Sequence, residues 1–126
     1  MLARALLGLI LQLSSGAQLA LAQPSQPEAD CQNGAAQRFD PLPNSSRPHR
    51  ATPAALCILV SSNGCTDRES FDVTVVPGHP LTRVTLARRR PDPCRMRSHD
   101  VWLRFGWTEL GLDGLRPVVV DERAPP

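Results

Sequence analysis

Two cysteines, Cys65 and Cys94, bracket a segment in which two runs of residues alternate between apolar and polar side chains. The runs, 71–76 and 81–88, repeat with the period of two that a half-buried β-strand requires. A loop with two prolines separates them, so we expect antiparallel neighbours. If Cys65 and Cys94 bond to each other, residues 64–97 form a closed two-stranded ribbon against which the rest of the chain must pack.

Three further short runs predict strands, at residues 54–61, 101–107 and 116–122. The first is continuously apolar, which favours a strand buried on both faces. Thr66 and Glu69 have the spacing of a capping box, so one helical turn is predicted at 66–70, and a second turn, closed by glycine, at 108–114. Together these patterns predict an all-β fold, a small disulfide-stapled antiparallel β-sandwich or open barrel of about five short strands.

The first 22 residues have the organisation of a secretory signal peptide. One positive charge, Arg4, precedes an apolar run at 5–11, and Ala20-Leu21-Ala22 provides a small-x-small cleavage site. The run is too short to span a hydrocarbon core of about 30 Å, so we favour cleavage after Ala22 over an uncleaved membrane anchor. The mature protein is then expected to be secreted or periplasmic, without stable membrane insertion.

Residues 23–53 are rich in proline, glutamine, serine, asparagine and alanine. Prolines fix φ and withhold backbone donors, and the low apolar content does not offset the entropy lost on ordering. We therefore expect a disordered leader over 23–53, a small β domain over 54–122 and a frayed tail over 123–126. A core carried by about 70 residues is marginal, and covalent cross-links commonly supplement one of this size.

Four cysteines, Cys31, Cys57, Cys65 and Cys94, follow the signal peptide. An even number in an oxidising compartment predicts disulfides, but the sequence does not decide among the three possible pairings. By elimination we prefer Cys31 with Cys57, which would pin part of the leader along the domain surface. The competing interpretation is a zinc site, which lacks CxxC or HxxxH spacing, so we expect no metal and no cofactor.

Three short motifs stand in order along the second half of the chain: Gly64-Cys65-Thr66 with Phe71, then Arg90-Pro91-Asp92-x-Cys94, then Glu109-Leu110-Gly111-Leu112. In them the chain resembles a group of small uncharacterised exported bacterial proteins with a GCT…F, RPDxC and ELGL pattern. The likeness covers residues 63–120. It implies export and supports the pairing of Cys65 with Cys94, but this group has no assigned activity. Cys31 and Cys57 lie outside the pattern, which leaves their pairing open.

All fourteen basic side chains are arginine, and removal of Arg4 with the leader leaves thirteen against twelve acidic residues. So small a net charge indicates neither a nucleic-acid nor a membrane partner. The arginines nevertheless gather at positions 83, 88, 89, 90, 95, 97 and 104. Guanidinium groups bind carboxylate, sulfate or phosphate with two hydrogen bonds, and an outward Trp beside Arg is a common binding hot spot.

The candidate binding face therefore comprises Arg88, Arg90, Arg95, Trp102 and Arg104, for an unknown protein or an anionic surface polymer. The alternative is a solvated surface in which Asp92, Asp100 and Glu109 neutralise the arginines. Trp102 is expected to share an outward strand face with Arg104, although both faces of a central strand in a sandwich can be covered.

Asp92 stands between two prolines and has a structural interpretation of its own. We expect it to accept hydrogen bonds from a backbone N–H and from Arg90, and so to hold the loop that aims Cys94 at Cys65. That role is favoured over a catalytic one.

His99 beside Asp100 would suit a general base, but no nucleophile or metal accompanies the pair, so no catalytic residue is assigned. His49, His79 and His99 are expected to be solvated loop residues. The favoured hypothesis is a non-catalytic exported binding protein that recognises an acidic protein or an anionic envelope component. An alternative is an inhibitor of an extracellular hydrolase that inserts a proline-braced loop, 77–80 or 91–93, into a cleft. A small enzyme that uses His99 and Asp100 is the third hypothesis.

Overall fold

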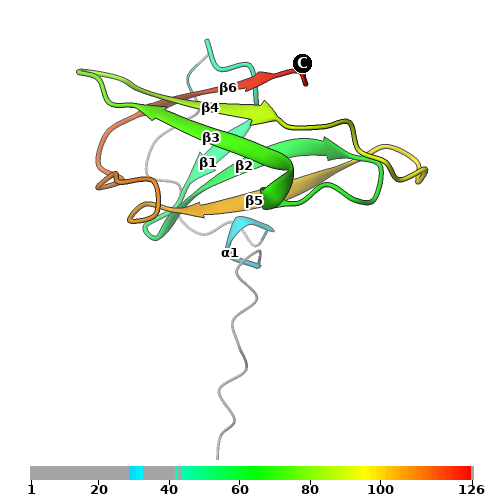
Figure 1. Cartoon of the computed structure of the whole chain (residues 1–126). Coiled ribbons are helices and arrows are strands. Elements are labelled where there is room, and N and C mark those ends of the chain that lie inside the picture. The colour runs from blue at the N-terminus through cyan, green and yellow to red at the C-terminus, as the bar shows by residue number, and fades with distance from the viewer. Residues whose placement is uncertain (1–28, 33–41, 43, 126) are drawn as a thin grey trace, which may run out of the picture.

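The computed structural model describes residues 29–32, 42 and 44–125, which form two three-stranded sheets packed face to face (Figure 1). The first sheet has the order β1-β2-β5 and the second the order β3-β4-β6. The strands are β1 (His49–Ala51), β2 (Ala55–Ser62), β3 (Phe71–Val76), β4 (Thr82–Arg88), β5 (His99–Gly106) and β6 (Val118–Arg123). A short helix, α1 (Ala29–Gln32), and a 3-10 turn, η1 (Arg68–Ser70), complete the described elements. The predicted small all-β fold is confirmed.

One face of each sheet forms the core, because alternate residues of a strand point to the same side. Leu56 and Ile58 of β2 join Val84 and Leu86 of β4 in one cluster of buried side chains. The other strands and the residue that follows β5 add Ala51, Phe71, Leu103, Phe105, Trp107, Val118 and Val120 to it. The inward faces predicted from the alternating runs are therefore the ones that are buried.

The strand directions depart from the prediction at one ladder. β3 and β4 are antiparallel, as expected, but β6 runs parallel to β4, with Val84 opposite Val120 (Figure 1). The chain leaves the first sheet after β5 and enters the second at the end where β4 begins, so the two strands point the same way. β4 and β6 are separated in the sequence by β5, a strand of the other sheet, so no local pattern indicates that they pair in parallel.

The ordered sheet begins before residue 54, so the prediction of a disordered leader is wrong over part of its range. β1 pairs antiparallel with β2, with Arg50 opposite Cys57. α1 is tied to the same strand by a disulfide between Cys31 and Cys57, whose Cα atoms are 5.7 Å apart. Order here comes from strand pairing and a covalent link rather than from apolar content. The predicted signal peptide, 1–22, and residues 23–28, 33–41 and 43 of the predicted leader lie outside the described residues.

The two predicted helical turns take different forms. Asp67, not Thr66, caps η1: its Oδ1 atom accepts the Ser70 N–H at 3.0 Å, and the Asp67 N–H donates to Ser70 Oγ at 3.1 Å. Ser70 therefore takes the place expected for Glu69 in the capping box. After β5, residues 107–111 form a hydrogen-bonded turn that ends at Gly111, whose φ of +68° favours glycine.

Candidate functional site

Asp92 is the centre of the connection between β4 and β5. Its Oδ2 atom accepts hydrogen bonds from the Thr66 hydroxyl at 2.7 Å and from the N–H groups of Asn63 and Cys65 at 2.8 and 3.2 Å. Its Oδ1 atom accepts the Cys94 N–H at 2.9 Å. These hydrogen bonds, with that of Thr66 the largest contribution, hold the pKa of the Asp92 carboxyl below its usual range. The expected loop-holding role is confirmed, although Arg90 is not one of the donors.

The same connection is closed covalently by a disulfide between Cys65 and Cys94, whose Cα atoms are 5.5 Å apart. Asp92 accepts hydrogen bonds from the backbone at both of these cysteines, so carboxylate and disulfide tie the same two segments together. Both predicted pairings are thus present in the structure. Two disulfides in so short a chain are typical of folding in an oxidising environment.

Arg88, a member of the candidate binding face, is engaged within the molecule. Its guanidinium donates to Ser61 O at 2.9 Å and to Thr66 Oγ1 at 3.0 Å, and it lies 3.4 Å from a Glu122 carboxylate oxygen. It also stacks over the Phe71 ring at 4.7 Å, and only 11% of the side chain is exposed. Arg88 therefore joins the two sheets and is not available to a ligand.

The remaining arginines of this region divide into paired and unpaired groups. Arg89 forms an ion pair with Asp72 at 2.7 Å, and Arg83 pairs with Asp121. The exposed side chains of residues 90, 95 and 97 form no ion pair with any described residue. These three, Arg90, Arg95 and Arg97, lie on the segment 89–98, which we name the arginine loop. It is fixed at its middle by Asp92 and Cys94.

Trp102 and Arg104 occupy a different place, the outer face of the first sheet beside α1. Arg50 of β1 lies over the Trp102 ring at 5.1 Å and donates to Cys31 O at 2.7 Å. The helix and its disulfide thus cover part of this face, and Trp102 is half-buried. The five residues predicted as one binding face therefore separate into one internal residue, two on the arginine loop and two on β5.

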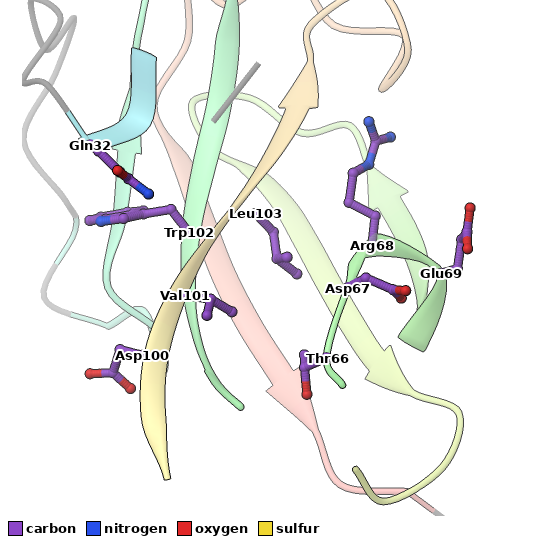
Figure 2. Close-up of a pocket in the computed structure, with 9 residues that line it drawn as sticks. All are labelled: Gln32, Thr66, Asp67, Arg68, Glu69, Asp100, Val101, Trp102 and Leu103. Atoms are coloured by element: carbon purple, nitrogen blue, oxygen red, sulfur yellow. The ribbon is translucent and has the colours of Figure 1, made fainter. Parts of the chain in front are cut away.

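A groove of about 680 Å³ follows the outer edge of β5 (Figure 2). Its walls are residues 100–103 of β5, Gln32 of α1 and the segment 66–69. In Figure 2, Trp102 points to the side of β5 on which Gln32 lies, and Leu103 points to the opposite side, toward segment 66–69. No sequence pattern indicates this groove, because its walls come from three separate parts of the chain.

Of the three histidines, His79 lies exposed in a loop as expected, His99 is exposed but begins β5, and only His49 is buried. His49 is buried in β1, where its Nδ1 atom lies 3.2 Å from Arg47 O. Burial lowers the pKa of His49. His99 and Asp100 are neighbours on a strand, so their side chains point to opposite faces, and His99 Nδ1 lies 3.0 Å from Arg97 O instead. The carboxylate does not orient the imidazole.

One group of side chains has the spacing of metal ligands: atoms of Cys65, Asp92 and Cys94 lie within 4.8 Å of one another. Both sulfurs belong to the disulfide, so neither is a thiolate that could bind a metal. The Asp92 carboxylate is occupied by the hydrogen bonds described above. The group therefore serves to hold the loop.

Comparison with protein-family models, with curated proteins and with solved structures found no match. Among residues 29–32, 42 and 44–125, no helix has the length and apolar content needed to cross a bilayer.

Proposed function

We propose that the protein is a non-catalytic exported binding protein, secreted or periplasmic, and that the arginine loop binds an acidic protein or an anionic envelope component. The observation that carries this proposal is a loop, fixed by Asp92 and by the Cys65–Cys94 disulfide, on which three exposed arginines form no ion pair with a described residue. The signal-peptide pattern of residues 1–22 supports export.

The chemistry of the loop suits an anionic ligand. Guanidinium groups remain charged and form paired hydrogen bonds with carboxylate, sulfate or phosphate. Arg90 and Arg95 lie on either side of Asp92 in the sequence, and the Asp92 carboxylate already accepts hydrogen bonds from the N–H groups of Asn63 and Cys94. A loop that is already ordered loses less entropy when it binds, so the fixed backbone favours affinity.

The test compares two double variants that remove the same charge. The first, Arg90→Ala/Arg95→Ala, changes the arginine loop. The control, Arg116→Ala/Arg123→Ala, changes two exposed arginines outside the loop that form no ion pair with a described residue. Binding of polyglutamate and of phosphatidylglycerol vesicles is measured by calorimetry at low and high salt. We expect the loop variant to bind about tenfold more weakly, equivalent to about 1.4 kcal/mol, and the control to bind like the wild type. Equal affinity of all three proteins would remove the arginine loop from consideration.

A second candidate function is inhibition of an extracellular hydrolase. Pro91 and Pro93 are exposed on the arginine loop, directly beside the residues that fix it, and a rigid projecting loop of this kind suits insertion into a cleft. The protein would be assayed at micromolar concentration against a panel of proteases and cell-wall lyases. Inhibition that is lost in a Pro91→Gly/Pro93→Gly variant supports this function, and no inhibition of any enzyme speaks against it.

A further inference from the structure

The edges of the two sheets differ in how they are covered. At β6, the N–H groups of Ser46 and Arg47 donate to Val120 O at 2.9 and 3.3 Å, and the Glu122 N–H donates to Ser46 Oγ at 2.9 Å. β1 is three residues long. β5 is eight residues long, and among the described residues no segment hydrogen-bonds to the backbone of 99–105 except β2. β5 is therefore the longest sheet edge to which no further described segment hydrogen-bonds.

Every second residue of β5 directs its backbone groups at this edge. The Trp107 N–H donates to Ala54 O at 3.3 Å, and in an antiparallel ladder bonded and non-bonded pairs alternate along the strand. The ladder between β2 and β5 runs without a bulge. The N–H and C=O groups of Asp100, Trp102 and Arg104 therefore point away from β2, along the groove shown in Figure 2.

An edge with these properties is a template for another strand. β5 contains no proline and no bulge, which are two of the features that prevent edge pairing. The groove beside it, about 680 Å³, leaves space for an added strand. Its far wall is held in place, because Thr66 donates to Asp92 and Asp67 caps η1. The site is thus formed before anything binds.

We propose that a second copy of the chain pairs with β5, antiparallel and around a two-fold axis at Trp102, so that two three-stranded sheets join into one. In this register Trp102 lies opposite Trp102 of the partner subunit, and Asp100 lies opposite Arg104 of the partner subunit. Residues whose backbone groups point outward then face one another, as a bonded antiparallel pair requires. The aromatic side chains and the opposite charges meet on the same face of the sheet.

The charges of Asp100 and Arg104 favour one binding partner for β5 and one register of pairing. Among the described residues, the Asp100 side chain accepts one hydrogen bond, from Ser61 Oγ at 3.4 Å, and Arg104 forms no ion pair. The Nε atom of Arg104 is buried and has no hydrogen-bond partner in the part of the chain that the structure describes. If the register shifts by two residues, Asp100 no longer lies opposite Arg104 of the partner subunit. Asp100 and Arg104 lie symmetrically about Trp102, so β5 is complementary to a second copy of itself. This symmetry favours a second copy over an unrelated peptide.

The first test exchanges the charges and measures sedimentation velocity from micromolar to near-millimolar concentration. Wild type is expected to dimerise as concentration rises, and Asp100→Arg alone and Arg104→Asp alone to weaken dimerisation by about tenfold or more, since each places like charges opposite each other. An equimolar mixture of the two variants restores both charge pairs and is expected to form a heterodimer. Wild type that stays monomeric throughout, or a dimer that tolerates both single changes, would overturn the proposal.

The second test does not depend on Arg104→Asp folding. Cα atoms of a bonded antiparallel pair are about 5.5 Å apart, which is a disulfide distance, so Trp102→Cys is expected to cross-link to its own copy under mild oxidation. The matched control is Thr74→Cys on β3, an exposed position at another sheet edge, which is expected to remain uncross-linked. Cross-linking at 74 but not at 102 would contradict the β5 interface. Neither test involves anion binding, so their failure leaves the arginine loop proposal untouched.

Discussion

Asp92 is the residue on which the arginine loop most depends, and Asp92→Asn tests this. The amide keeps the shape but loses the charge that five hydrogen-bond donors now share, three of them backbone N–H groups. We expect a lower denaturation midpoint for Asp92→Asn than for wild type. The control, Asp72→Asn, affects a carboxylate whose side chain is 63% exposed and has one ion pair, and it is expected to change the midpoint little.

The pH dependence of the Asp92→Asn effect has a definite sign. Because the folded pKa of Asp92 lies below its value of about 3.9 in the unfolded chain, its stabilisation is complete above that pH and is lost as pH falls toward the folded pKa. The difference in stability between wild type and Asp92→Asn should therefore be constant from neutral pH to about pH 4 and shrink below it. A difference that grows on acidification would contradict this role.

His49 gives a second pH dependence at the scale of one residue. Burial lowers its folded pKa below the unfolded value of about 6.5, so the unfolded chain binds the proton first and stability falls as pH drops below that value. One proton accounts for at most about 1.4 kcal/mol per pH unit. Urea denaturation between pH 7.5 and about pH 5 should show this decline in wild type and in the exposed-histidine control His99→Gln, and a flatter profile in His49→Gln. Identical slopes in all three proteins would contradict the assignment.

At the scale of elements, the two disulfides are expected to have separable effects. Cys31→Ser/Cys57→Ser opens a span of 26 residues, which costs about 3–4 kcal/mol in the chain-entropy model, and releases α1 from the face that carries Trp102. The tryptophan emission of this double variant should shift to longer wavelength. The shift should be absent when Trp102→Phe is added to the variant. Cys65→Ser/Cys94→Ser should instead weaken polyglutamate binding with little change in emission. The same emission shift in both variants would show that the two disulfides do not act separately.

The elements that could be predicted from sequence are those whose residues alternate over a full strand. Phe71–Val76 is the plainest case, because Phe71 and Val73 face the core and Asp72 faces solvent. β1 could not be predicted: three residues show no period, and its order depends on pairing with β2. The parallel ladder between β4 and β6 depends on the path of the chain through the other sheet, which no local pattern records.

The candidate site was predictable only where covalent or local chemistry determines it. Asp92, between two prolines and two residues before Cys94, indicated a loop held by a carboxylate, and the structure shows one. Arg88 looked like its neighbours in sequence, but its position between the sheets gives it partners from three distant segments. The β5 groove also required knowledge of the folded sheet edge.

At the scale of the whole molecule, the sandwich carries a covalent link at each of two surfaces. Cys31–Cys57 holds α1 on the outer face of the first sheet, and Cys65–Cys94 holds the arginine loop beside the start of β5. The shared core lies between the sheets and takes part in neither surface. This separation is why changes in the arginine loop are expected to alter ligand binding without altering the fold.

The measurement that tests the proposed function most directly is nuclear magnetic resonance of the ¹⁵N-labelled, disulfide-bonded protein titrated with polyglutamate. The arginine side-chain Nε–H signals and the backbone amides of 89–98 report on the loop. We expect saturable shifts at Arg90, Arg95 and Arg97, while the buried Arg88 signal and the amides of β2 and β4 stay in place. Shifts confined to arginines outside the loop, or no saturable shift at all, would contradict the arginine loop as an anion-binding surface.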